Sequence, residues 1–241
     1  MTLRILLLQA RNEDDPMRLA ERQSFAEKTG LQLDQIVPHD LLAGPPGLAA
    51  LETHDALMVG GSGDYYVSNR SLPHFEAQMD FLREVVDRGH PMFASCFGFQ
   101  ILVAALGGEV TYDPESMEVG TYQLTVSEAG RVDPLMGRLP KVFDAQMGRK
   151  DRASRLPPGV VNLASSERNP YQALRVPDKP IWATQFHPEL DLETNLERFF
   201  RYLEGYAELL SLEEQRLAAE NFRESPHTEA LLPGFLDLVF G

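Results

Sequence analysis

Two spacings of apolar residues alternate along the first hundred positions. Segments 16–28 and 71–88 place apolar residues three or four apart, which predicts two amphipathic helices with one face toward a core. Short apolar runs of the kind that form buried strands lie on either side of these helices, at residues 3–9, 31–37, 55–59 and 91–95. Strands that alternate with helices predict an α/β fold: a flavodoxin-like, mostly parallel sheet with helices on both faces.

The second half of the chain first turns to short extended pieces. We expect strands at 118–126, 141–143, 160–165, 171–176 and 181–186. The segment 191–210 then reads as an amphipathic helix, and its inward residues are expected to be Leu192, Leu196, Phe199, Phe200 and Leu203.

Two more helical pieces follow, at 211–222 and 228–240, and Pro226 should keep them apart. We therefore predict one α/β domain over residues 1–203. Residues 204–241 are expected to form a C-terminal helical extension packed on that domain.

Composition narrows the possible functions. The 241 residues include 36 acidic and 22 basic ones, a formal net charge of −14, which argues against a general nucleic-acid or anionic-membrane surface. No apolar run approaches the roughly 18 residues of a membrane span. The apolar start is interpreted as a strand rather than a signal peptide, because acidic residues follow at once. One cysteine cannot form an internal disulfide, which favours a reducing, cytoplasmic location.

That single cysteine, Cys96, lies in the stretch around which the chain is organised. An apolar run precedes it and an apolar helical pattern follows at 101–106, so Cys96 is placed at a turn from strand to helix. A nucleophile elbow has this order and needs small neighbours, here Ala94 and Gly98. The N-terminus of the following helix would favour the thiolate. The alternative is a buried structural cysteine.

A second segment supplies partners for a nucleophilic cysteine. The apolar strand at 181–186 is followed by His187 and, two residues later, by Glu189. A cysteine nucleophile needs a base to accept its proton and a third group to orient that base. Cys96, His187 and Glu189 can fill these three roles.

Two motifs together resemble those of the class I (triad type) glutamine amidotransferases. The motifs are Ala94-x-Cys96-x-Gly98-x-Gln100 and Gln185-Phe186-His187-Pro188-Glu189. The family has a G-x-C-x-G-x-Q elbow and a downstream F-H-P-E segment in the same order. The resemblance covers about residues 3–203, and the amidotransferase domain of GMP synthetase is the subgroup that it suggests.

The resemblance implies a glutaminase that forms a cysteine thioester and gives glutamate and ammonia. It implies an oxyanion hole made by the N–H groups of Gly61 and Phe97, where Ser62 stands in place of the family's proline. Gln100 would help to hold glutamine, although a packing amide is an equal alternative. An ammonia-accepting synthetase subunit is implied as a partner.

Two positions depart from the family pattern. Ala94 replaces the first glycine of the elbow and adds a methyl group at a crowded turn. Arg149 takes the place of a histidine that many relatives carry two residues before an aspartate, which is Asp151 here. A guanidinium could bind the α-carboxylate of an amino-acid substrate, or Arg149 could be one more surface arginine.

Other site types are not supported by the sequence, and two other functions stay open. The remaining histidines have no cysteine or carboxylate at metal-ligand spacing, and the glycine-rich segments match neither a phosphate loop nor a dinucleotide fingerprint. We therefore expect no metal and no cofactor. A γ-glutamyl hydrolase or peptidase would use the same Cys-His-Glu triad, and a non-catalytic binding protein could share the fold.

Overall fold

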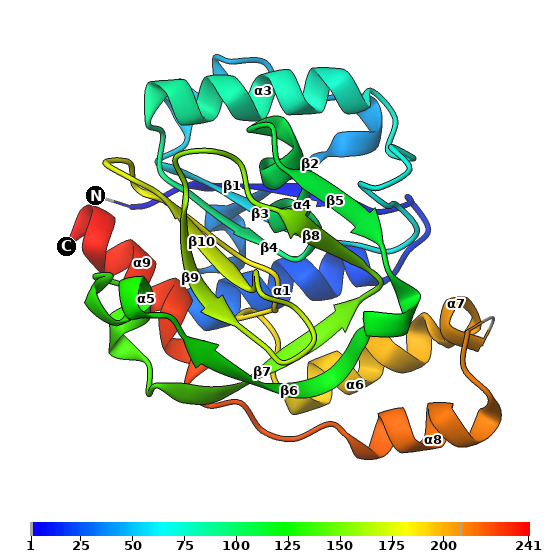
Figure 1. The fold of residues 1–241 in the computed structure, drawn as a ribbon. Coiled ribbons are helices and arrows are strands. Elements are labelled where there is room, and N and C mark those ends of the chain that lie inside the picture. Colours follow the sequence, from blue (N-terminus) through cyan, green and yellow to red (C-terminus); the bar gives the residue numbers. More distant parts are fainter. Residues whose placement is uncertain (1, 208) are drawn as a thin grey trace.

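The computed structural model describes residues 2–207 and 209–241, without the side chains of 206 and 207. In this part of the chain, nine strands form one central sheet (Figure 1). From one edge to the other, these strands are β2 (Ile36–Asp40), β1 (Ile5–Ala10), β3 (Ala56–Ser62), β4 (Met92–Ser95), β11 (Ile181–Thr184), β10 (Ala173–Val176), β9 (Val161–Ser165), β6 (Glu118–Val126) and β7 (Val142–Arg149). The first five strands are parallel, and the remaining ones continue the sheet as antiparallel neighbours.

Helices cover both faces of this sheet, which confirms the predicted α/β architecture. The helices α3 (Phe75–Arg88) and α4 (Phe97–Ala105) pack on one face, against alternate strand residues such as Leu6 and Val59. The opposite face carries α1 (Met17–Thr29) and α9 (Leu231–Phe240), which pack against residues of the other alternation, including Ile5. The sheet is thus buried on both sides, as near-continuous apolar strands require.

The C-terminal helices begin at α6 (Leu192–Arg201), which starts with a capping box between Asp191 and Thr194. The predicted single helix over 191–210 is divided, because α7 (Leu203–Ala207) follows after Tyr202. The expectation for Phe200 was wrong: its side chain is 56% exposed, whereas Phe199 is buried. In the described part of the chain, no helix combines the length and apolar character needed to cross a membrane.

Beyond α7, helices α8 (Leu212–Glu220) and α9 confirm the two further helical pieces, and the break between them contains Pro226. Phe235 of α9 packs edge-to-face against Phe93 and Trp182 of the central sheet. The C-terminal helix therefore contributes to the main core. The remaining short elements are η1 (Leu33–Gln35), η2 (Leu41–Ala43), α2 (Ala50–Thr53), η3 (Pro114–Ser116), α5 (Glu128–Val132), η4 (Met136–Arg138) and η5 (Thr228–Ala230).

Two strands outside the main sheet were not predicted as a pair. β5 (Glu109–Tyr112) and β8 (Asp151–Arg155) form a two-stranded antiparallel ribbon beside α4. Their mixed polar sequences lack a long apolar run, so the periodicity gives little signal for them. The ribbon carries Asp151 to the carboxyl edge of the parallel strands.

Candidate active site

The turn between β4 and α4 is a strained elbow with Cys96 at its apex. Cys96 has φ 51° and ψ −103°, a conformation that few residues other than glycine adopt. Its N–H donates to Thr184 O at 2.8 Å, and its carbonyl accepts from Gln100 N at 3.0 Å. These two hydrogen bonds fix the elbow to β11 and to the first turn of α4.

Small residues on both sides of Cys96 are explained by close packing. A Cβ at Gly98 would lie 2.5 Å from the Val59 carbonyl oxygen, so only glycine fits there without a backbone shift. Ala94, the departure from the family pattern, is fully buried in β4 between Val59 and Ala183 of the neighbouring strands. Its methyl group belongs to the core, and the elbow is formed with alanine in this position.

Gly98→Ala is expected to lower the free energy of unfolding by about 1–3 kcal/mol, because the added methyl group forces α4 away from β3. Chemical denaturation measures the change. Gly47→Ala is the matched control, since a Cβ there meets no atom within 4 Å and the backbone needs no positive φ. A loss of similar size in both variants would contradict the packing argument.

The structure brings together the three residues predicted to form a triad. His187 Nδ1 lies 2.6 Å from Glu189 Oε1, and Ser95 Oγ donates to the same oxygen at 3.1 Å. The thiol of Cys96 lies near enough to the imidazole for each group to shift the pKa of the other. All three triad side chains are buried. This is the order nucleophile, base and orienting carboxylate that thiol activation requires.

Charges within the triad offset the effect of burial. Burial alone would raise the pKa of the Cys96 thiol, but the neighbouring His187 and Arg198 together lower it. Burial lowers the pKa of His187 and Arg198 adds to that effect, yet Glu189 and Cys96 raise it on balance. Burial likewise raises the pKa of Glu189, and the contact with His187 outweighs it, so the net direction is down. The shifts favour a thiolate beside an imidazolium.

Alkylation of Cys96 by iodoacetamide is expected to have its midpoint below the pH at which an ordinary thiol reacts, about 8.5. The thiolate is the reactive form, so the rate falls as pH drops through the lowered pKa and is constant above it. Intact-protein mass spectrometry across a pH series measures the rate. His187→Gln should move the midpoint upward, and an unchanged midpoint in that variant would contradict the thiolate–imidazolium pair.

The two N–H groups predicted to form the oxyanion hole, those of Phe97 and Gly61, differ in their hydrogen bonding. Phe97 is the first residue of α4, so its N–H has no acceptor within the helix and lies directly after the nucleophile. The Gly61 N–H, in contrast, donates to Glu21 Oε1 at 3.0 Å. This differs from the free donor that we expected, because α1 places the buried Glu21 carboxylate under the glycine loop. The role of Gly61 in catalysis stays a prediction.

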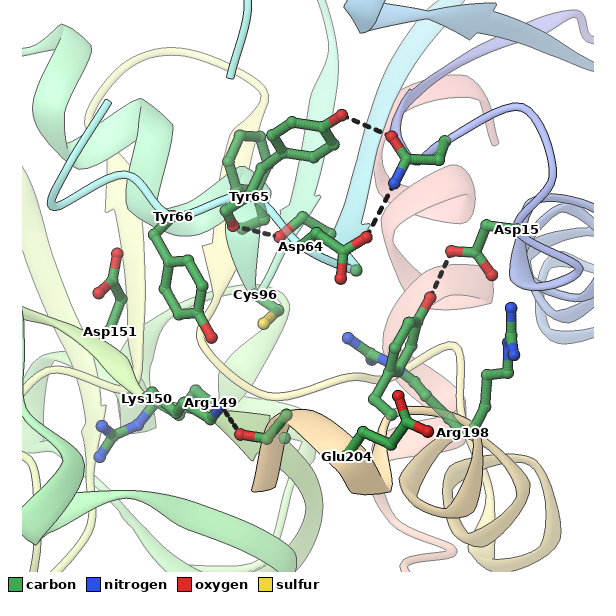
Figure 2. Close-up of a pocket in the computed structure, with 18 of the residues that line it drawn as sticks. Asp15, Asp64, Tyr65, Tyr66, Cys96, Arg149, Lys150, Asp151, Arg198 and Glu204 are labelled. Atoms are coloured by element: carbon green, nitrogen blue, oxygen red, sulfur yellow. Dashed lines mark hydrogen bonds between the residues drawn. The ribbon is translucent and has the colours of Figure 1, made fainter. Parts of the chain in front are cut away.

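A cavity of about 410 Å³ opens over Cys96. Figure 2 shows Cys96 between Tyr66 and Asp151 on one side and Asp15 and Arg198 on the other. The volume is sufficient for a small amino acid or a short γ-glutamyl compound.

Gln100 lies in the wall of this cavity, where its amide nitrogen donates to Asp151 O at 3.0 Å and to Gln185 Oε1 at 3.1 Å. These bonds tie α4 to β8 and to the end of β11, which is a packing role. A contact of Gln100 with substrate stays a prediction.

Arg149 also borders the cavity, but its guanidinium has a buried partner. Its Nε donates to Glu118 Oε2 at 2.9 Å and its Nη2 lies 2.6 Å from the same oxygen, with both side chains fully buried. The alternative of a surface arginine is therefore wrong. The pairing also differs from an arginine open to a substrate carboxylate, because Glu118 already balances its charge. Substrate binding by Arg149 stays a prediction.

Sequence reasoning missed a buried polar network behind the glycine loop. Arg11 donates to Glu21 Oε1 at 2.9 Å and approaches Asp15 Oδ2 at 3.5 Å. Tyr202, which follows α6, donates to Asp15 and lies within hydrogen-bond distance of Arg11. Tyr202 is far in the sequence from the other three residues, so no local pattern could have joined it to them. The network anchors the chain after β1 to the end of α6 beside the cavity.

The geometry agrees with the comparison to known families. A family model for class I glutamine amidotransferases matches residues 35–203. The chain belongs to this family of enzymes. Among curated relatives of this class I member, the GMP synthase of Thermosipho africanus is 38% identical over 117 residues, which cover 48% of this chain. The GMP synthase of Thermosipho melanesiensis is 32% identical over 149 residues, or 61% of this chain.

The amidotransferase chain spans only a minor part of those relatives, 22% and 28% of their lengths. Solved structures match it over nearly its whole length. A glutamine amidotransferase from Thermotoga maritima has a TM-score of 0.74 at 20% identity and covers 99% of this chain and 98% of its own. A glutamine amidotransferase from Methylobacillus flagellatus has a TM-score of 0.71 at 19% identity, covering 98% and 95%. At these identities the similarity establishes the fold, including its C-terminal helices.

Proposed function

We propose that this chain hydrolyses the side-chain amide of glutamine through a thioester on Cys96. The observation that carries the proposal is the grouping of Cys96 with the hydrogen-bonded pair His187 and Glu189, where Cys96 lines a cavity large enough for an amino acid. Membership in the class I family supports this reaction over other uses of a cysteine nucleophile.

In the proposed reaction, the Cys96 sulfur attacks the amide carbon, and a carbon–sulfur bond forms as the carbonyl oxygen becomes an oxyanion. The Phe97 N–H donates to that oxygen. His187 gives its proton to the amide nitrogen, the carbon–nitrogen bond breaks, and ammonia leaves. His187 then takes a proton from water, the hydroxide attacks the thioester, and the carbon–sulfur bond breaks to give glutamate. Glu189 holds the imidazole throughout.

We infer that a synthetase subunit in the cytoplasm receives the ammonia. The relatives named above are GMP synthases that are much longer than the matched segment. A synthetase partner that receives ammonia would supply the function of their remaining length.

The test is to incubate the purified protein with glutamine and to measure whether glutamate and ammonia are released in equal amounts. A panel of γ-glutamyl peptides in parallel reports release of an amine or a peptide instead. Equimolar glutamate and ammonia, lost in Cys96→Ala, support the proposal. Hydrolysis confined to γ-glutamyl peptides would replace it with a γ-glutamyl hydrolase. No turnover of either substrate, with Cys96 shown to be reactive, would contradict glutaminase activity of the isolated chain.

A further inference from the structure

Arg198 is a buried arginine that faces the catalytic histidine. It lies on α6, two turns after the start of that helix, and its side chain is only 8% exposed. Its Nη1 is 2.8 Å from His187 Nε2 and 3.2 Å from His187 Nδ1. The same side chain reaches the cavity above Cys96 and a second cavity of about 170 Å³ behind the triad.

These two distances show that the guanidinium lies over the face of the imidazole. The two ring nitrogens point toward different edges of the ring, so an atom in line with either lone pair would be far from the other nitrogen. A nitrogen close to both is therefore above the ring. The Nδ1 position is already bonded to Glu189.

The glycine loop packs against both the guanidinium and the imidazole. A Cβ at Gly61 would lie 2.9 Å from Arg198 Nη2 and 3.1 Å from His187 Cε1. The missing side chain of Gly61 thus leaves the space that Arg198 and His187 fill. This packing explains why residue 61 is a glycine, whether or not its N–H contributes to an oxyanion hole.

Arg198 differs from the other buried arginines in its charge balance. Within the described residues, Arg11 and Arg149 are the other arginines with such burial, and each forms an ion pair with a carboxylate. No carboxylate oxygen of the described residues lies within ion-pair distance of Arg198, whose polar contacts are the His187 nitrogens. A buried cation is costly unless an anion balances it.

The titratable and charged groups around Arg198 identify that anion. They are Cys96, His187 and Glu189 on the side of the elbow, Glu197 and Tyr202 on the same segment, and Arg11, Asp15, Glu21 and Glu27 on the side of β1 and α1. Glu189 is bonded to His187, and Glu21 is bonded to Arg11. Cys96 and Glu189 both have His187 as their cationic partner, so a thiolate and a carboxylate would share one imidazolium, and Arg198 is the second positive charge beside them.

We propose that Arg198 is a positioning residue: it clamps the His187 imidazole against the glycine loop and supplies the positive charge that balances the Cys96 thiolate. The positive charge of Arg198 lowers the pKa of both Cys96 and His187. It favours the thiolate, and it makes the His187 imidazolium a stronger acid, which eases proton transfer to the departing amine. The inference needs only a reactive Cys96 and adds to the proposed glutaminase mechanism.

The experiment compares the pH dependence of Cys96 alkylation by iodoacetamide in the wild type, Arg198→Met and Arg198→Lys. Arg198→Met removes the charge and keeps much of the stem, so its midpoint should rise by about one pH unit. Arg198→Lys keeps the charge and should restore most of the wild-type midpoint. Arg88→Met, at an exposed arginine on α3, loses the same charge and should leave the midpoint unchanged.

Thermal unfolding of each variant shows whether it is folded, and Arg198→Gln replaces the methionine variant if that one does not fold. A midpoint equal to the wild type in a folded Arg198→Met or Arg198→Gln protein would overturn the proposal, as would an equal rise in Arg198→Lys. The assay uses no glutamine, so it stands apart from the outcome of the substrate test. If glutamine is hydrolysed, kcat should fall in Arg198→Met with little change in KM.

Discussion

Cys96→Ala is expected to reduce kcat for glutamine hydrolysis by roughly 10⁴-fold or more. The substitution removes the atom that forms the thioester, and His187 and Glu189 cannot replace it, since triad members act as a unit. The elbow itself should persist, because its backbone is held by hydrogen bonds from Cys96 N and O rather than by the thiol. Steady-state release of glutamate measures the loss, and thermal unfolding checks the fold.

Glu189→Gln is the companion variant for this prediction. It keeps the shape of the side chain but removes the charge that orients His187 and raises its pKa. We expect a smaller loss than in Cys96→Ala, together with an altered pH profile. Substantial hydrolysis by a folded Cys96→Ala protein would contradict covalent catalysis at this position.

Glu118→Ala is expected to lower the free energy of unfolding by about 3–5 kcal/mol. Glu118 is fully buried and binds Arg149 through one oxygen, which also accepts from Gln172 at 2.7 Å. Its other oxygen accepts from Ser166 at 2.6 Å. Removing the carboxylate leaves the Arg149 charge buried without a partner. The melting temperature should fall by roughly 10 °C.

Glu109→Ala is the matched control, because Glu109 and Arg155 form an ion pair at 3.0 Å with both side chains largely exposed. Solvent screens such a pair, and its loss should cost less than about 1 kcal/mol. Chemical denaturation of both variants and of Glu118→Gln gives the comparison. Equal effects of Glu118→Ala and Glu109→Ala would show that the buried pair does not stabilise the fold.

Much of the fold could be predicted because its strands and helices carry strong, local patterns. The apolar stripe of α3 and the runs of β1, β3 and β4 gave those elements within a few residues. The boundary was wrong before β2, where residues 33–35 form a 3₁₀ turn within a run that had been predicted as strand. The order of the strands could not be derived, because β11 enters beside β4 through pairing between distant residues.

The grouping of Cys96, His187 and Glu189 was also predictable, since their two motifs are local and each lies at the end of a strand. Arg198 was not, although it lies one residue before the buried Phe199 and three after the buried Asn195, on the inner face of α6. A helical-wheel reading that allowed polar residues on the inner face would have found it. The ion pair between Arg149 and Glu118 could not be predicted, because it joins residues that are distant in the sequence. The same is true of the hydrogen bond from the Gly61 N–H to Glu21.

The insertion of β11 between β4 and β10 has a consequence for synthesis of the protein on the ribosome. Until residues 181–184 have emerged, the edge of β4 that leads into the elbow lacks its neighbour, and Cys96 N lacks Thr184 O. A strand edge without its partner is prone to pair with other chains. His187 and Arg198 emerge later still, and Phe235 of α9 must follow to cover Phe93 and Trp182. A nascent chain therefore carries Cys96 without its neighbours while residues 97–187 are added, and the site can assemble only after β11, His187 and Glu189 have followed.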